Sequence, residues 1–417
     1  MFANVPDDDA PQHLRPVLEN VDAFYRAEVE PREKRLGRRL TDSLEYIDRD
    51  GKLHPEVQAA RREIQRASGK RGLFALHLPK TIGGGGLSRT EMFYVEEKVY
   101  AYGVGLAPAI LAWTDGASPR LIFCSAEQRA RFVDPLVRGE KTCCHAVTEP
   151  DAGSNLFDLT TRAERRGERW VLNGHKALIT NPFEADIVHV LAVTDPGQGK
   201  RSFSYFQFDA KEHVGKGFRH GRLNRTMFDD GLTGELHLEG LELGDDALIG
   251  ERGAGFDIAL TSINWTRMRR GGMCSAWSKL LIDLSLARLK TRRVGGKPLG
   301  RNQGLQWMLA DMVCDWYSAR STSLACLRGI EASGAWWDTR RSKEQIRLFA
   351  IMKIVNDEAF YRVADRALQL HGGLGVMKDS VVNKLFQIAR NLRIPGGTDE
   401  SQRNTIAESL GLSASME

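Results

Sequence analysis

The hydrophobic period of this chain changes twice along its 417 residues. From about residue 14 to 143, apolar side chains recur at helical spacing among many charges. Between about 145 and 250 the period becomes two, and Glu235–Glu239 alternates strictly between polar and apolar residues, as a half-solvated strand does. After Gly253 the helical spacing returns, for example in the stripe Trp277–Ala287. This order predicts an α+β protein with a helical domain, a compact β domain and a helical bundle, at residues 1–143, 144–253 and 254–417.

Local signals refine this outline. Asn173-Gly174 lies between two β-rich runs and predicts a hairpin turn, because both residues tolerate positive φ. Asp186–Val193 and Ser202–Phe208 are rich in β-forming residues and predict further strands. The uncharged run Val99–Thr114 has 16 residues, fewer than the roughly 18–20 that span a bilayer. We therefore expect a buried helix in this run and no membrane span.

Composition excludes several classes of function. The chain is 42% hydrophobic and 27% charged, which is ordinary for a globular protein and excludes intrinsic disorder. Lys and Arg total 59 against 54 Asp and Glu, and the net charge of +5 comes without a basic tract, which argues against a nucleic-acid partner. Six cysteines without a CxxC pair indicate reduced thiols in a cytoplasmic protein, and ten scattered histidines predict no metal site.

Several familiar catalytic motifs are absent from the sequence. No GxGxxG segment follows a predicted strand, and no GxxxxGK[ST], GxSxG or HExxH motif occurs. What remains is the segment Val147–Asn155, in which Pro, Asp and Gly build a tight turn beside the hydroxyls of Thr148 and Ser154. Such a turn can hold a polar ring or a phosphate, and it can equally be an ordinary connection between domains.

Short strings from about residue 70 to the C-terminus follow one another in an order and spacing that resemble the acyl-CoA dehydrogenase family. One such string would be weak evidence, whereas the ordered set is specific. The stretch before about residue 70 is long and poorly matched. The strings are Leu78-Pro79, Gly83–Gly86, Glu127-Gln128, Pro135-Leu136, Gly139-Glu140, Ala146–Asn155, Leu172–Lys176, Ile179–Asn181, Leu248–Glu251, Gly253–Phe256, Gln369–Gly375, Gly396–Thr398 and Ser401–Arg403.

The resemblance implies an N-terminal α-helical domain, a middle β-barrel domain and a C-terminal four-helix bundle. It implies FAD, bound between the β domain and the helical domains, with a neighbouring subunit completing the site. The implied substrate is an acyl-CoA or acyl-carrier-protein thioester, and an electron-transfer partner or oxygen would accept the electrons. The implied assembly is a homodimer or homotetramer, or a heteromer with a related subunit.

The resemblance also assigns roles to residues by their positions in the motifs. Thr148 and Thr180 would hydrogen-bond the isoalloxazine ring, together with backbone N–H groups near Val147. Arg292 would pair with the pyrophosphate of a neighbouring subunit's FAD. Leu178 stands where many members carry Phe or Trp beside the flavin, so one flavin wall differs. Val294 and Gly295 likewise replace a Thr or Ser and a Phe. The other implied contacts are Gln303, Gln369, Gly372, Gly373 and Thr398 for the cofactor, and Ser154 and Arg267 for the substrate.

The catalytic base of the family is missing from both of its known positions. The base is a carboxylate because proton abstraction beside a thioester needs a group that is ionised yet desolvated. The usual glutamate precedes the Gly-Thr of the C-terminal loop, and that position is Gly396. Other members carry it on the first bundle helix just before an arginine, and that position is Thr266. Gly396 still offers its backbone N–H, which in the family polarises the thioester carbonyl.

Three hypotheses therefore stay open for this divergent sequence. The protein is a dehydrogenase whose base is Asp399, Glu400, His371 or a residue of the unmatched N-terminal region, although a structural role is favoured for Asp399 and Glu400. Alternatively, the flavin does other work, as in a monooxygenase, or in reduction or elimination on an acyl thioester. As a third possibility, the chain is a catalytically silent subunit of a heteromeric acyl-CoA dehydrogenase.

Overall fold

The computed structural model describes residues 9–40, 42–227 and 231–412. These residues form two compact units, each built from separate stretches of the chain. Unit 1 contains the described residues of Met1–Tyr46, Ser88–Pro108 and Thr266–Glu417. Unit 2 contains those of Ile47–Leu87 and Ala109–Trp265.

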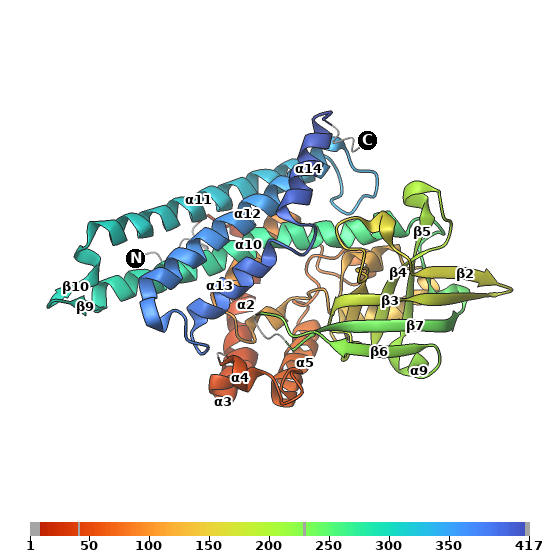
Figure 1. Ribbon diagram of the computed structural model, residues 1–417, viewed down its shortest axis with the longest axis horizontal. Helices are drawn as coiled ribbons and strands as arrows, with labels where there is room; N and C mark the ends of the chain where they lie inside the picture. The colour runs from red at the N-terminus through yellow and green to blue at the C-terminus, as the bar shows by residue number, and fades with distance from the viewer. Residues whose placement is uncertain (1–8, 41, 228–230, 413–417) are drawn as a thin grey trace. The chain divides into compact units, whose positions relative to one another are not determined.

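Unit 1 is helical. Its long helices α11, α12 and α13 lie side by side (Figure 1). A short hairpin of β9 (Arg293–Val294) and β10 (Lys297–Pro298) separates α10 from α11. The helices are α2 (Arg15–Phe24), α3 (Glu30–Leu36), α4 (Ser43–Tyr46), α6 (Arg89–Ala101), α10 (Gly255–Thr291, in this unit from Thr266 on), α11 (Gln303–Ala332), α12 (Lys343–His371), α13 (Val381–Leu392) and α14 (Asp399–Ser409).

Two of these helices begin at reciprocal caps. Ser88 Oγ accepts a hydrogen bond from the backbone N–H of Glu91 at 3.1 Å, and a Glu91 carboxylate oxygen accepts one from the backbone N–H of Ser88 at 2.7 Å. Ser342 and Gln345 form the same arrangement at α12. The apolar stripe predicted at Trp277–Ala287 lies on α10 and packs with residues of α11, α12 and α13 in a core that includes Trp277, Met312, Phe360 and Leu385.

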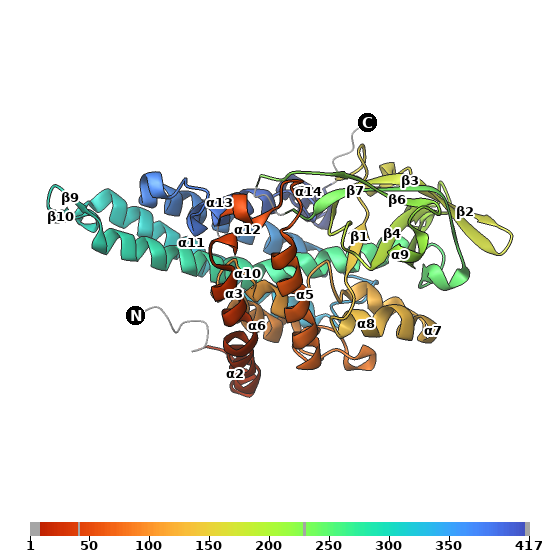
Figure 2. The same cartoon turned by 90° about the horizontal axis from the view of Figure 1, so that it is seen from below.

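Unit 2 contains a mixed eight-stranded sheet in the order β6-β7-β3-β2-β4-β5-β8, with β1 parallel to β4 (Figures 1 and 2). Its helices are α5 (Pro55–Lys70), α7 (Ala126–Gln128), α8 (Asp134–Val137) and α9 (Ala210–His213). Its strands are β1 (Cys143–Ala146), β2 (Arg162–Arg166), β3 (Arg169–Thr180), β4 (Ile187–Val193), β5 (Phe203–Asp209), β6 (Phe218–Leu223), β7 (Thr233–Leu243) and β8 (Leu248–Ile249).

The predicted period of two is confirmed in β7. Leu236, Leu238 and Leu241 point into the core of unit 2, whereas Glu235 and His237 face the other side of the sheet. The predicted strands at Asp186–Val193 and Ser202–Phe208 are also confirmed, as β4 and β5. Every residue of β4 is buried, because β1, β2 and β5 all pair with this strand.

The hairpin predicted at Asn173-Gly174 is wrong, because β3 runs straight through this dipeptide. The turn lies earlier, at Gly167, between β2 and β3. Long-range contacts override the local preference. Asn173 Oδ1 accepts a hydrogen bond from the backbone N–H of Gly240 at 2.7 Å. Gly174 packs so closely on Thr161 that a Cβ there would lie 2.2 Å from the Thr161 hydroxyl oxygen.

The single buried helix predicted for Val99–Thr114 is also wrong. The α6 helix ends at Ala101, and a 3-10 turn at Ala107–Ile110 follows after an irregular segment. Gly103 adopts a φ of +111°, and Pro108 lacks the N–H that a continuous helix needs, so the run is divided. Within the described residues, no helix combines the length and apolar character needed to cross a membrane.

Candidate functional site

A buried ion pair anchors the turn that follows β1. Glu149 is 4% exposed, and Lys176 on β3 is fully buried. Lys176 Nζ lies 2.8 Å from both Oε1 of Glu149 and the carbonyl oxygen of Val147, and it donates to both. Oε2 of Glu149 accepts from the backbone N–H and the hydroxyl of Thr160, each at 2.7 Å. These contacts fix the conformation of the predicted segment Val147–Asn155, in which Ser154 is exposed.

The pKa values of the pair keep both groups charged at neutral pH. Burial alone would raise the pKa of Glu149, but the Lys176 ammonium and the hydrogen bonds from Lys176, Thr161 and Thr160 lower that pKa to about 2. Burial lowers the pKa of Lys176 to about 8, against the opposing effect of Glu149. The turn is thus held by a charge pair that acid dissociates.

We expect Glu149→Gln to destabilise the protein by about 1–3 kcal/mol at neutral pH, because Lys176 loses its counter-charge and can shed its proton. The folded pKa of Glu149, about 2, lies below the ordinary glutamate value of 4.5, so the unfolded chain binds more protons between these values. The contribution of ionised Glu149 to the free energy of unfolding of the wild type is complete above pH 4.5 and falls as the pH drops towards 2. The gap in unfolding free energy between wild type and variant should therefore narrow over that window.

Urea unfolding at a series of pH values measures this gap. Glu164→Gln is the matched control, because Glu164 is an exposed residue of β2. Its stability should follow wild type within about 0.5 kcal/mol at every pH. A gap for Glu149→Gln that stays constant from pH 7 to acid would contradict the assignment.

The two threonines expected at the flavin ring belong to hydrogen-bonded segments. The backbone N–H of Ala177 donates to the carbonyl of Thr148 at 2.9 Å, and Thr180 follows three residues later at the end of β3. Both threonines are partly exposed. Neither hydroxyl forms a hydrogen bond with another of the residues that the structure describes, so both can serve a bound polar ring.

The end of β3 turns an apolar side chain outwards. The register between β3 and β7 shifts between Lys176 and Ile179. Leu178 adopts a φ of +56° and Asn181 one of +63°, conformations that cost a non-glycine residue about 1–2 kcal/mol. Asn181 Nδ2 donates to the Cys143 carbonyl at 3.2 Å and holds this bend. The Leu178 side chain is 63% exposed, and strain combined with an exposed apolar side chain is typical of a binding surface.

The residues expected at the pyrophosphate and adenosine belong to unit 1. Arg292 follows α10, Gln303 begins α11, and Gln369 lies in the last turn of α12, with Gly372 and Gly373 directly after that helix. All five are exposed. The β9–β10 hairpin, the start of α11 and the end of α12 lie towards the same end of the helical bundle of unit 1 (Figure 1).

Gly396 and Thr266, the two positions at which the resemblance places the base, face each other. A Cβ on Gly396 would lie 3.8 Å from Thr266 Oγ1 and 3.4 Å from Arg270 Nη2. Arg267 Nε donates to the Gly396 carbonyl at 2.8 Å. Burial lowers the pKa of Arg267 to about 9, and the guanidinium groups of Arg270 and Arg341 add to this effect. The two base positions thus converge in space, and cationic side chains surround them.

Asp399 is buried and bound by two cations. Lys353 Nζ lies 2.5 Å from Oδ1 of Asp399, and Arg393 Nε donates to Oδ2 at 3.0 Å. This arrangement stabilises the loop before α14, and its contacts do not favour Asp399 as a proton acceptor. Thr398 caps the same helix, because its Oγ1 accepts from the backbone N–H of Ser401 at 3.1 Å. Glu400 is exposed in the first turn of α14.

The contribution of Lys176 was missed in the sequence, although a signal for it exists. Lys176 occupies a fully buried position of β3, between the half-exposed His175 and the buried Ala177. A lysine buried in a strand requires a buried acidic partner. Because Asp and Glu are seldom fully buried, only a few acidic residues in the sequence are candidates for this partner. Lys353 gives a weaker signal. It stands four residues before Asp357 on the same helix, a spacing that brings two side chains together, and the two groups lie 2.9 Å apart.

Comparisons with known proteins agree with this architecture. Family models for acyl-CoA dehydrogenases match the chain over residues 12–140 for the N-terminal domain, 144–241 for the middle domain and 253–411 for the C-terminal domain. A 3-(aryl)acrylate reductase of Clostridium sporogenes (strain ATCC 15579) is 27% identical over 352 residues, which cover 84% of this chain and 90% of the relative. An acyl-CoA dehydrogenase of Bacillus subtilis (strain 168) is 28% identical over 353 residues, which cover 84% of this chain and 89% of the relative.

A crystal structure shows the same fold. The acyl-CoA dehydrogenase of Bacillus anthracis, complexed with FAD, matches with a TM-score of 0.81 at 23% identity, over 97% of this chain and 68% of that chain. The three domain models, the helix–sheet–helix order and these relatives lead to one assignment. The chain belongs to the acyl-CoA dehydrogenase family and is a flavoenzyme of that type, with FAD as its cofactor.

Proposed function

We propose that the protein carries out FAD-dependent redox chemistry at the Cα–Cβ bond of an acyl thioester, and that a group other than the usual glutamate handles the Cα proton. The observation that carries this proposal is the convergence of Gly396 and Thr266. The loop that presents Gly396 is kept in place, yet neither position supplies a carboxylate. The binding machinery is retained and the proton acceptor is changed.

Backbone and arginine groups near Gly396 suit the thioester carbonyl. The N–H of Gly396 would donate to this oxygen and stabilise the negative charge that develops on it during reaction. Arg267 holds the Gly396 carbonyl and thereby orients the peptide that precedes Gly397. With a pKa of about 9, Arg267 stays charged at neutral pH and adds a favourable potential for an enolate-like oxygen. Ser154 would contact the CoA side of the substrate.

Several features of the structure support the proposed cofactor residues. Thr148 and Thr180 present hydroxyls that form no hydrogen bond within the described part of the chain, and Leu178 presents an apolar surface. Arg292, Gln303, Gln369, Gly372 and Gly373 would hold the pyrophosphate and adenosine of a neighbouring subunit's cofactor, and Thr398 would also contact the cofactor. Bound FAD would exchange a hydride with Cβ of the substrate.

The relatives support both directions of such chemistry, because one is named an acyl-CoA dehydrogenase and another a 3-(aryl)acrylate reductase. The proposed setting is a cytoplasmic homodimer or homotetramer that passes electrons to a protein partner or to oxygen. A second candidate is a flavin monooxygenase of the same fold. The absence of a carboxylate at Gly396 and Thr266 favours it, because oxygen activation does not require abstraction of a Cα proton.

Anaerobic mixing of the flavin-loaded protein with acyl-CoAs tests the proposal. We expect butyryl-, octanoyl-, palmitoyl- or 3-phenylpropionyl-CoA to bleach the oxidised flavin band. Removal of the Cα proton should limit the rate of bleaching, because the usual carboxylate is missing. Bleaching only by a nicotinamide-dependent reductase, followed by an oxygen-dependent product, would overturn the dehydrogenase assignment in favour of the oxygenase. Flavin occupancy, measured first, checks the proposed cofactor residues.

A further inference from the structure

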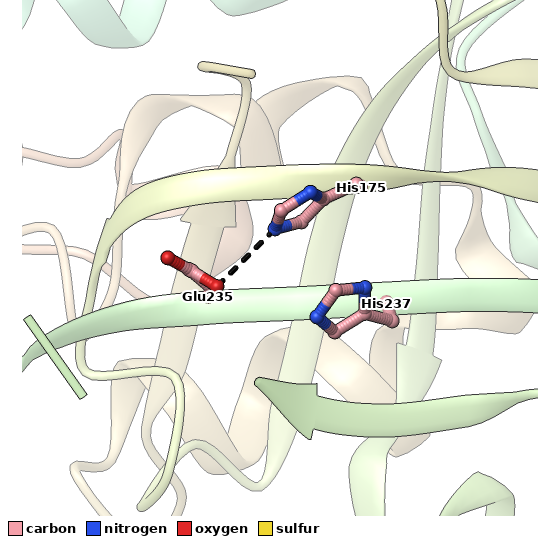
Figure 3. A group of neighbouring side chains, drawn as sticks. All are labelled: His175, Glu235 and His237. Carbon is pink, nitrogen blue, oxygen red and sulfur yellow. Dashed lines mark ion pairs between the residues drawn. The ribbon is translucent and has the colours of Figure 1, made fainter. Parts of the chain in front are cut away.

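Three side chains on the sheet of unit 2 have the composition of a metal site and take no part in the chemistry above. His175 lies on β3, and Glu235 and His237 lie on β7. His175 and His237 are directly opposite in the strand register. Glu235 shares the face of His237, since side chains two residues apart in a strand point the same way. Figure 3 shows the three side chains turned towards one another.

The distances in this group suit coordination. Each residue offers one ligand atom, and the three atoms lie within 4.8 Å of one another. Nε2 of His175 is buried and lies 3.3 Å from Oε2 of Glu235, without the alignment of a hydrogen bond. Two ligand atoms that bind one tetrahedral Zn²⁺ at about 2.0–2.1 Å are about 3.3–3.5 Å apart. This pair already has that spacing, and the ligand nitrogen of His237 lies within 4.8 Å of both atoms.

Neighbouring residues orient the carboxylate. Asn224 Nδ2 donates to Oε1 of Glu235 at 3.4 Å, and Arg222 Nη2 lies 3.5 Å from the same oxygen. The second oxygen, Oε2, is therefore the one that faces His175. Outer hydrogen bonds of this kind are typical of carboxylates that bind metals. Arg219 of β6, which pairs with His237 in the strand register, forms an ion pair with Glu239 at 2.7 Å.

A glycine on β6 leaves room beside the histidine. A Cβ on Gly221 would lie 2.7 Å from Nε2 of His237 and 2.7 Å from Cβ of Glu235. Gly221 is not among the positive-φ glycines, so its backbone does not require this residue type. The missing side chain instead keeps the space next to the imidazole nitrogen open.

We propose that His175, Glu235 and His237 bind one divalent transition-metal ion, with Zn²⁺ as the ion that two imidazoles and one carboxylate suit best. The His175 side chain is 38% exposed although its ligand nitrogen Nε2 is buried, so the site lies beside solvent from which water can fill the fourth position. The two imidazole rings lie parallel at 4.2 Å, and both can turn a nitrogen to the same ion. The bound ion would join β3 to β7 between the two register shifts of this ladder.

Zinc binding to the full-length, untagged protein tests the proposal. After chelator treatment and dialysis, calorimetric titration with Zn²⁺ and elemental analysis give affinity and stoichiometry. We expect one tight site per chain in wild type. His237→Gln and His175→Gln should each weaken it by more than about 10²-fold, beyond the 10–100-fold cost of losing an outer-shell partner. Gly221→Ala should also weaken binding, although it leaves all three ligands in place.

His213→Gln is the matched control, because His213 lies on α9 of the same unit and outside the group. It should bind zinc as wild type does. Unfolding temperatures are also measured in the presence of a chelator. Variants whose unfolding temperature equals that of wild type under these conditions have kept the fold, and only these variants are compared. Zn²⁺ should raise the unfolding temperature of wild type and His213→Gln but not of His237→Gln. The proposal is overturned if wild type binds no zinc, or if His175→Gln and His237→Gln bind it as tightly as wild type, which would place the ion elsewhere, for example at the exposed Cys314.

Discussion

Replacing Thr266 with glutamate is expected to raise the rate of flavin reduction by acyl-CoA about 10²-fold. A positioned general base typically contributes 10²–10⁴-fold, and the low end applies here because Arg267 and Arg270 stabilise the ionised carboxylate and so weaken it as a base. Thr266 lies on α10 and faces Gly396, so the new carboxylate would enter the helix without backbone strain. Glutamate at Gly396 itself would be strained, because that residue has a φ of +76°.

Thr266→Gln is the control for this substitution, because glutamine has the size of glutamate and cannot accept the proton. Anaerobic stopped-flow spectroscopy at equal flavin occupancy gives the rate constants. A rate for Thr266→Glu no faster than that of Thr266→Gln would show that proton abstraction at this position does not limit the reaction. The positional match of Thr266 to the family's second base position would then carry no functional meaning.

Asp399→Asn is expected to destabilise the folded protein by about 3–5 kcal/mol. The carboxylate is fully buried and contacts both Lys353 and Arg393, so its removal leaves a fully buried ammonium and a partly exposed guanidinium with one carboxylate fewer to balance their charge. Arg393 cannot relieve this by losing its proton, because a guanidinium remains charged in proteins. The loss should appear as a lower urea midpoint for the whole chain and a lower yield of folded protein.

Glu400→Gln is the neighbouring control, since Glu400 is exposed one residue further along α14. It should change stability by no more than about 0.5 kcal/mol. The opposite pattern would favour Asp399 as the base. If Asp399→Asn keeps wild-type stability and flavin content but loses bleaching by acyl-CoA, the carboxylate acts in the reaction rather than in the fold.

The order of helices, sheet and helices could be predicted because hydrophobic period is a local property that packing reinforces. In β7 the alternation of Leu236 and Leu238 with polar residues survives folding, because one face of that strand meets the core. Local turn chemistry was less reliable. Asn173-Gly174 prefers a turn in isolation, but the backbone of Gly240 and the side chain of Thr161 hold it extended.

In the candidate site, too, local strings could be identified from the sequence, whereas contacts between distant residues could not. The motif strings located Gly396 and Thr266, 130 residues apart, through resemblance, but only the fold shows that the two positions face each other. Pairings such as that of Lys353 with Asp399 depend on how separate helices pack, and no spacing in the sequence encodes them. The group of His175, Glu235 and His237 was missed for this reason, because strand register brings these residues together.

The extended path of β3 through Asn173-Gly174 also bears on chemical ageing of the protein. Asparagine before glycine deamidates readily when the following backbone nitrogen can attack the side-chain amide and close a five-membered succinimide ring. A strand conformation holds that nitrogen away from the amide, and the hydrogen bond from Gly240 restrains the side chain further. Deamidation at Asn173 should thus require β3 to open locally, so the aspartate and isoaspartate that accumulate during storage would record how often this strand leaves its sheet.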